Sequence, residues 1–302
     1  MNNSLLTVAI FIWLLAVGLS IWFGFLYIES NENMSYTILQ TDVKKHLNDN
    51  IGDFLWGTIG IILTFTTTIF LFITFREQRA QLKTTQKQAE KVRFETTYFN
   101  ILSMLKQVQD TVNANIASRL ANKEIKNIVD YYTNFQKRYS CYLNEHPQFS
   151  EKVNNFDPLK ANSAEIETYK EKIATLYTEM VEETNCNIGY LYRYLFNAIK
   201  FVIDDPYNLS HTDAAERYLN LLQAQLSNEE LCLLFYNCIS AYGENKKGEL
   251  QFMTILDKYN FLENIDSSFL LNRNQYIFYP HTSFKFLNRE ELKHVKKKSN
   301  ND

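Results

Sequence analysis

Long apolar stretches alternate with polar ones at the start of the chain. Two of them, Leu5–Ile28 and Phe54–Phe75, contain no Asp, Glu, Lys, Arg or His. A helix needs about 20 apolar residues to cross the hydrocarbon core of a bilayer, and both stretches reach that length. The pattern therefore predicts two transmembrane helices, at 1–28 after a short cytosolic N-terminus and at 54–75. A signal peptide, which begins with basic residues, and a pair of buried core helices, which keep a polar face, fit the pattern less well.

The charges next to these stretches predict their orientation. Residues 29–53 carry five acidic side chains but only Lys44 and Lys45 as lysine or arginine, whereas residues 76–93 carry six Lys and Arg. Basic residues that flank a membrane span stay in the cytoplasm. We therefore expect residues 29–53 to form an external loop and both termini to lie in the cytoplasm, with the lipid bilayer as a partner.

Small side chains recur on one face of each predicted span, which lets helix backbones approach closely. Two interpretations remain open: the faces pack the two helices as a hairpin, or they form the seam of a homo-oligomer in which threonines line a polar path. A selective channel is not supported, because neither span contains the charged residues that mark ion routes. The two faces consist of Ala16, Ser20, Gly24, Gly57, Gly60, Thr64 and Thr67, and the threonines are Thr64, Thr66, Thr67, Thr68 and Thr74.

Beyond Phe75 the apolar positions disappear and then return at helical spacing. Residues 76–93 are good helix formers with almost no apolar face, which indicates a solvated helical stalk of coiled-coil character. From Phe94 onward apolar residues recur every three or four positions, which predicts a cytosolic all-helical domain over 94–288. The charged segment 289–302 is expected to be a frayed tail.

Two local signals refine this domain. The stretch with His146-Pro147 and Asp157-Pro158 lacks helical spacing, so it predicts a loop or a partner-facing insertion. Ser227 and Glu230 form an S-x-x-E capping box, in which each side chain accepts a hydrogen bond from a backbone N–H at the start of a helix. The helix that follows, Glu229 to Tyr242, is apolar on most sides and is expected at the centre of the core.

Composition agrees with an all-α fold and excludes several functions. The chain has 8 Gly and 4 Pro among 302 residues and no clear strand alternation. A net charge of −3 provides no basic field for nucleic acid, which is not expected as a partner. We expect no cofactor and no metal, because the cysteines lack zinc-site spacing. They are interpreted as small core residues: Cys141, Cys186, Cys232 and Cys238.

Three segments together resemble one known family. They are Phe94–Leu102, Leu191–Phe201 and Tyr218–Asn237, and the third contains Gln223-Ala224-Gln225-Leu226-Ser227, followed by Glu230-Leu231 and Tyr236-Asn237. The third motif, with Gln223 where Arg is usual, is the most specific sign of similarity to the phage abortive infection family labelled putAbiC, over about residues 54–262. The resemblance implies a bacterial inner-membrane protein that stops phage propagation by harming or arresting the infected cell. It implies no catalytic mechanism.

The residues of this motif have structural and functional interpretations. Capping alone explains Ser227 and Glu230, and buried amides at Gln225 and Asn237 would form polar bridges between helices. Alternatively, several side chains converge on a pocket for a ligand or for a phage or host trigger protein. Helical spacing places Arg193, Asn197 and Lys200 on one face, and the full set is Arg193, Lys200, Gln225, Tyr236 and Asn237.

An enzymatic function has little support in the sequence, which has no glycine-rich phosphate loop, nucleophile elbow or H-E-x-x-H motif. Arg289 and His294 have the spacing of the short motif of all-helical HEPN ribonucleases, and they are the weak catalytic alternative. The leading hypothesis is a membrane effector whose cytosolic helices sense infection and whose spans assemble and perturb the inner membrane. The alternatives are a membrane-tethered nuclease and a non-catalytic membrane scaffold.

Overall fold

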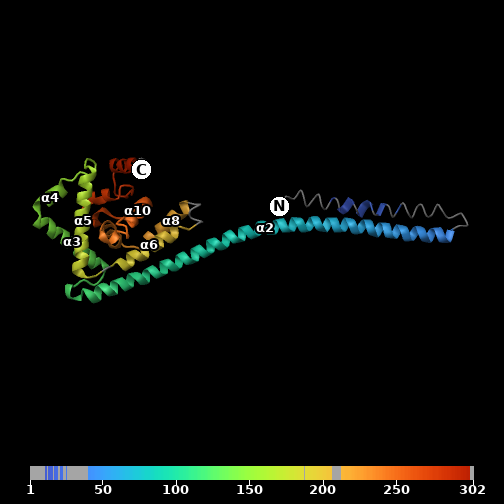
Figure 1. The fold of residues 1–302 in the computed structure, drawn as a ribbon, viewed down its shortest axis with the longest axis horizontal. Coiled ribbons are helices and arrows are strands. Elements are labelled where there is room, and N and C mark those ends of the chain that lie inside the picture. The colour runs from blue at the N-terminus through green and yellow to red at the C-terminus, as the bar shows by residue number, and fades with distance from the viewer. Residues whose placement is uncertain are drawn as a thin grey trace. The chain divides into compact units, whose positions relative to one another are not determined.

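The structure is a computed structural model that describes residues 11, 13–15, 17–19, 21, 22 and 25, and residues 40–299 except 187 and 206–211. Helices, turns and irregular segments make up these residues, and no strand occurs among them, so the predicted all-helical class is confirmed (Figure 1). The chain divides into two compact units, Met1–Ala89 and Glu90–Asp302. The division falls inside the predicted stalk.

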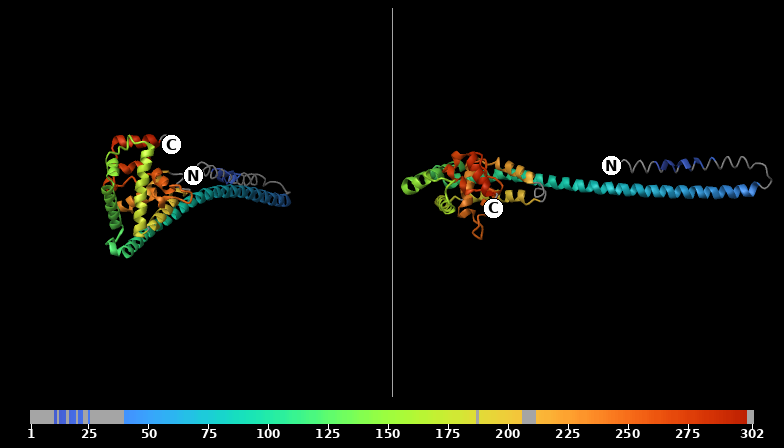
Figure 2. Two further views of the ribbon diagram at one scale, coloured as in Figure 1. Left: turned by 60° about the vertical axis from the view of Figure 1, so that its left-hand side comes forward. Right: turned by 90° about the horizontal axis from the view of Figure 1, so that it is seen from above.

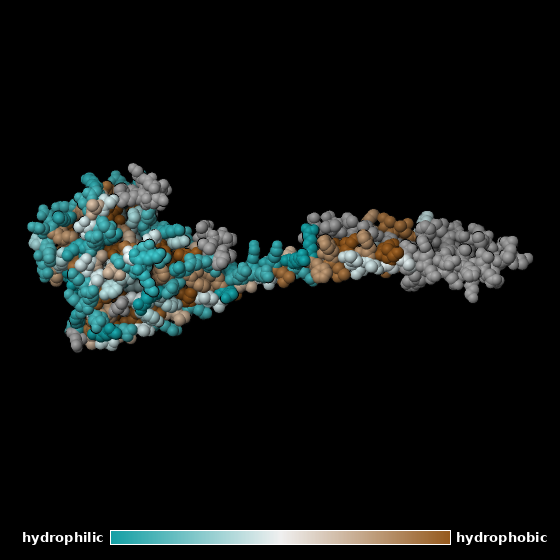
Figure 3. Space-filling view, in the orientation of Figure 1, coloured by the Kyte–Doolittle hydropathy of each residue, from teal (hydrophilic) through white to brown (hydrophobic). Residues whose placement is uncertain are grey.

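Helix α2, Gln40–Arg119, is 80 residues long. It contains the predicted second span, the stalk and the first amphipathic helix as one element, because no Gly or Pro interrupts the sequence between Gly60 and Arg119. It also begins inside the stretch 29–53 that we interpreted as a loop. The part of α2 from Ile59 is long and apolar enough to cross a membrane, judged by length and composition. Figure 3 shows its apolar residues in brown, followed by the hydrophilic residues of the stalk in teal.

Most of the first predicted span, including Ala16, Ser20 and Gly24, lies outside the described part of the chain. In α2 the five threonines use their hydroxyl groups within the helix: each donates to the carbonyl oxygen four residues earlier at 2.8 Å. Their donors are therefore satisfied without a partner helix or water. The two alternative interpretations of the small-residue faces remain predictions.

The second unit packs shorter helices against the C-terminal part of α2. Local signals start several of them: Asn127 caps α3, and complete capping boxes at Asn162 and Ser227 open α5 and α9. The predicted capping box is therefore present. The helices are α3 Ile128–Glu145, α4 Pro147–Asn154, α5 Ser163–Thr184, α6 Gly189–Ile203, α8 Thr212–Gln223, α9 Asn228–Ile239, α10 Gln251–Lys258 and α11 Arg289–Ser299 (Figures 1 and 2).

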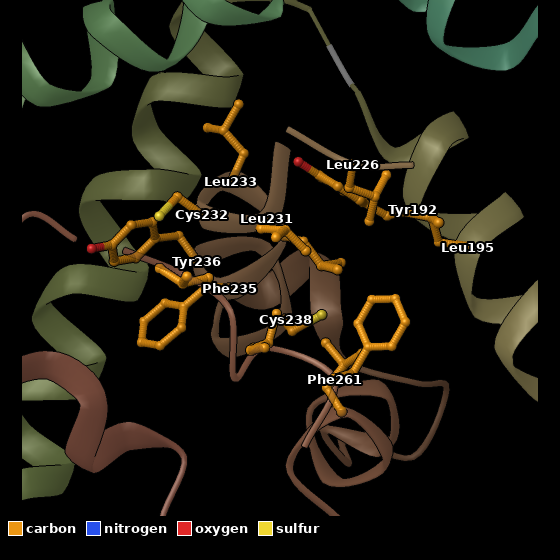
Figure 4. Close-up of a cluster of buried hydrophobic side chains, with 14 of the residues drawn as sticks. Tyr192, Leu195, Leu226, Leu231, Cys232, Leu233, Phe235, Tyr236, Cys238 and Phe261 are labelled. Carbon is orange, nitrogen blue, oxygen red and sulfur yellow. The ribbon is translucent and has the colours of Figure 1, made fainter. Parts of the chain in front are cut away.

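Helix α9 is the centre of the core, as its sequence predicted. Every residue from Glu230 to Ile239 is buried, and the helix contacts α3, α5 and α10. Figure 4 shows its side chains extending in several directions among Tyr192 and Leu195 of α6 and Phe261. Burial of a Leu or Phe side chain contributes roughly 1.5–3 kcal/mol, so this one helix anchors much of the unit.

Three expectations about the second unit are corrected. The segment predicted as a loop contains α4, which starts with Pro147 at its first position, where the missing N–H costs nothing. The segment predicted as a frayed tail forms α11, whose Glu291 and Val295 are buried. Arg273 holds this helix through donors at 2.5 and 2.7 Å from the two Glu291 oxygens. The third correction concerns the cysteines, all of which we interpreted as core residues: Cys141 is exposed, and the other three are buried.

Candidate functional site

The five residues of the predicted pocket do not form one site. Tyr236 is fully buried; its hydroxyl donates to Gln275 Oε1 at 2.6 Å and accepts the N–H of Leu271 at 2.7 Å. Lys200 pairs with Asp204 on its own helix at 3.7 Å. The Gln225 side chain is exposed; the residue uses its backbone, whose carbonyl oxygen accepts from Gln109 and whose N–H donates to the Leu222 carbonyl oxygen at 3.1 Å. Arg193 and Asn237, in contrast, border the same cavity.

Arg193 and Asn237 border a cavity of about 490 Å³ between α6, the end of α9 and the start of α10. This volume lies in the range of small-molecule pockets. Asn197 lies one turn beyond Arg193 and also borders it, as its spacing predicted. The remaining lining residues are Gly189, Tyr192, Phe196, Tyr242, Gly243, Glu244, Asn245, Gln251 and Phe252.

The wall of the cavity depends on a tight turn after α9. A Cβ added at Gly243 would lie 2.4 Å from the carbonyl oxygen of Cys238, so only glycine allows this approach. The buried Ser240 hydroxyl donates to the Asn237 carbonyl oxygen at 2.8 Å and accepts the N–H of Tyr242 at 3.3 Å. These contacts hold Tyr242 at the cavity beside the end of α9.

The polar groups of the cavity differ in burial. Asn237 is 5% exposed, and its Nδ2 donates to the Tyr177 hydroxyl at 3.4 Å. Burial raises the pKa of Tyr177 well above its ordinary value, so this phenol stays protonated. Arg193 and Glu244 are exposed and place opposite charges at the mouth. The amide groups and aromatic rings of the lining suit hydrogen bonding and aromatic contact with a ligand.

A second polar centre lies at the capping box. The Glu230 carboxylate accepts the N–H of Ser227 at 2.8 Å, and both its oxygens accept from Gln109 Nε2 of α2, at 3.0 and 2.9 Å. The same Gln109 nitrogen donates to the Gln225 carbonyl oxygen at 3.1 Å. Burial raises the pKa of Glu230 above its ordinary value. The motif residues here therefore join α2 to the α8–α9 turn, which is a structural role.

Gln223 is the buried amide of this motif. Its Nε2 donates to the Phe261 carbonyl oxygen at 2.5 Å, and its Oε1 accepts from Asn264. The polar bridge that we expected at Gln225 is thus made by Gln223, two residues earlier. Position alone could have suggested this, because Gln223 lies on the face of α8 that carries the buried Leu219 and Leu222.

The described residues do not bring Arg289 and His294, the residues of the nuclease alternative, together in a site. Arg289 is exposed at the first position of α11, and the side chain of His294 lies outside the described part of the chain. No group of three or more His, Cys, Asp or Glu side chains that could hold a metal ion occurs among the described residues.

A larger groove of about 1150 Å³ lies between α4 and α5, over the segment that we interpreted as a partner-facing insertion. Phe149, Phe156 and Tyr169 contribute apolar surface, and charged side chains of both signs surround them. All its lining residues fall within 149–175.

The comparisons with known proteins distinguish the cavity from the groove, because a family model matches the segment that lines only one of them. Residues 183–270 match the family model putAbiC, described as putative phage abortive infection protein. No curated protein and no solved structure matches the chain. The resemblance seen in the sequence is thereby confirmed over this segment, whereas Phe94–Leu102 lies outside it. The smaller cavity is lined entirely by residues of the matched segment, and the larger groove lies outside it.

Proposed function

From the putAbiC match over residues 183–270 we propose that this chain is a bacterial abortive infection effector anchored in the inner membrane. Its cytosolic helical domain senses infection, and its membrane helices assemble and perturb the bilayer. Lipid is the partner of residues 5–28 and 54–75, and both termini lie in the cytoplasm. The match to the family model is the observation that carries the proposal, because it associates this segment with arrest of phage.

Two further features support the membrane placement. Part of α2 is apolar enough to span a bilayer, and its large side chains are exposed, including Phe65, Phe70 and Phe72 at 56–71%. Exposed apolar side chains in such number are stable in lipid rather than in water. Six basic residues follow in the stalk and anchor the cytoplasmic end of the span.

The cavity beside Asn237 is the proposed trigger site. It is formed within the matched segment, and it combines amide groups and aromatic rings with a cation at its mouth. Such a lining suits a small polar ligand or a short segment of a trigger protein. In the proposal, occupation of this cavity starts the response of the membrane helices.

Phage challenge of bacteria with and without the chain tests the function. At a low phage dose we expect surviving cultures, and at a high dose we expect collapse, with depolarisation measured by a potential-sensitive dye. Arg193→Ala should abolish protection, whereas Lys200→Ala on the same helix should leave it unchanged, because only Arg193 borders the cavity.

Three results would count against the proposal. Equal phage yield with and without the chain removes the defence function. Equal protection by the two variants removes the cavity as trigger site. RNA or DNA fragmentation without depolarisation, abolished by Arg289→Ala, would favour the nuclease instead.

A further inference from the structure

One face of α2 has an uncharged heptad pattern from the apolar stretch through the stalk. Ten positions recur with alternating spacings of four and three residues, which is the a/d pattern of a coiled coil. We define them as the seam face: Gly57, Ile61, Thr64, Thr68, Leu71, Phe75, Gln78, Leu82, Thr85 and Ala89. The same spacing continues in the sequence at Val92, Thr96 and Phe99.

The seam face is exposed along its whole length. All ten residues are exposed, and the large ones strongly so: Ile61 73%, Phe75 61% and Leu82 61%. A different stripe, spaced in the same way, is partly buried: Ile59, Ile62, Thr66, Ile69 and Ile73. At 100° per residue this second stripe lies on the opposite side of the helix. The span therefore has one partly covered side and one open side.

The charges of the stalk avoid the seam face. Residues 76–89 contain five charged side chains, and none occupies a seam position. Lipid cannot explain an apolar seam residue in the stalk, because Leu82 lies seven residues beyond Phe75, the last residue of the apolar stretch. An exposed leucine on an uncharged face of a helix whose other faces carry charged residues is typical of a coiled-coil interface.

We infer that a second copy of this chain packs in parallel along the seam face. The inference rests on the proposed function only in taking 54–75 as a membrane span, since two copies inserted in the same direction hold their α2 helices parallel. Gly57 has no atom within 4 Å of an added Cβ, so the seam is open to a partner backbone there.

The flanking positions permit this pairing. In a parallel coiled coil, the residue just before each a position lies opposite the residue of the partner helix whose number is higher by five. The a positions of the seam in the stalk are Leu82 and Ala89. Here Gln81 faces the partner's Gln86, and Gln88 faces the partner's Arg93, so no like charges meet. From Gly57 to Ala89 the seam is about 48 Å long, and with a helix about 10 Å wide it buries roughly 500 Å² per copy. That total of roughly 1,000 Å² reaches the lower limit for a specific interface.

Polar seam positions define the register. Gln78 and Thr85 occupy a/d positions in the stalk, where polar residues lower stability but favour the alignment that pairs them with each other. Each residue of the seam therefore meets its own equivalent in the second copy, as expected for a two-fold symmetric contact.

Disulfide crosslinking of the full chain in membranes tests the seam. The parent carries Cys141→Ser, because Cys141 is exposed and the other cysteines are buried. In this parent we compare Leu82→Cys with Lys83→Cys, which is exposed but off the seam. Under mild oxidation Leu82→Cys should form a covalent dimer at least about tenfold faster than Lys83→Cys, because pairing raises the effective concentration of the thiols.

Equal rates for the two variants, or no dimer from either, would refute the packing of a second copy along the seam face. The face would then contact lipid or another protein. Gln78→Cys provides a second seam position and should behave as Leu82→Cys does. Phage challenge of the same strains separates the two proposals. Crosslinking without protection supports the seam and contradicts the proposed function, whereas protection without crosslinking does the reverse.

Discussion

Tyr236 and Tyr192 offer a matched test of whether a motif tyrosine is structural. Both are buried, and Tyr→Phe removes only the hydroxyl. The Tyr236 hydroxyl makes two hydrogen bonds, so its loss leaves the Leu271 N–H without this acceptor, and Gln275 Oε1 keeps only the Asn272 N–H at 3.4 Å. Within the described part of the chain, the Tyr192 hydroxyl has no hydrogen-bond partner.

The expected magnitudes differ clearly. A buried polar group that loses its partner costs about 1–3 kcal/mol, so Tyr236→Phe, which affects two groups with one partly compensated, should lower the free energy of unfolding by about 2–4 kcal/mol. Tyr192→Phe removes an unpaired buried hydroxyl and should change stability by less than about 1 kcal/mol, towards stabilisation. A domain of this size loses about 2–4 °C in Tm per kcal/mol.

Thermal unfolding of the detergent-solubilised full chain measures both variants. Tyr236→Phe should melt about 4–16 °C below the parent, and Tyr192→Phe at or above it. Protection against phage below the melting temperature should persist in Tyr236→Phe, because this residue does not border the cavity. Equal melting shifts for the two variants would refute the assignment of these hydrogen bonds, and loss of protection in a folded Tyr236→Phe would restore Tyr236 to the functional site.

Three further outcomes are expected from the same melting assay. Ser227→Ala removes an N-cap and should cost about 1 kcal/mol, whereas exposed Ser268→Ala at a short 3-10 turn should cost less. Gly243→Ala forces its Cβ against the Cys238 carbonyl oxygen and should cost about 1–3 kcal/mol; an unchanged Tm would show that the turn relaxes freely. Arg273 lowers the pKa of Glu291, so the stability from this pair is present above the ordinary glutamate pKa and is lost as pH falls through the lowered value. Glu291→Gln should therefore melt below the parent at neutral pH, and a gap that persists in acid would contradict the ion pair.

The sequence predicted those parts of the fold that depend on local patterns. The all-helical class, the capping box at Ser227 and the central position of α9 follow from apolar spacing and backbone capping. It failed where a helix depends on distant contacts. The tail at 289–302 is too polar to suggest burial, yet Arg273 and a few apolar contacts are enough to dock α11.

The candidate site shows the same limit. Helical spacing alone brings Arg193 and Asn197 to one side of α6, where both border the cavity. Tyr242, Gln251 and Phe252 were missed, because they reach the cavity through a turn whose path depends on Gly243. Tyr236 was assigned wrongly to the pocket because adjacent residues of a helix point about 100° apart, and no local signal tells which of Tyr236 and Asn237 faces the opening.

The burial of α9 limits which of its residues a ligand or partner protein can contact, although this helix lies within the matched segment. Because Glu230 to Ile239 are all buried, a ligand in the cavity contacts this helix only at its C-terminal tip, where Asn237 borders the cavity. Natural or laboratory variation that alters recognition should therefore gather in the rim around that tip. Changes along the body of the helix should instead appear as failures of folding.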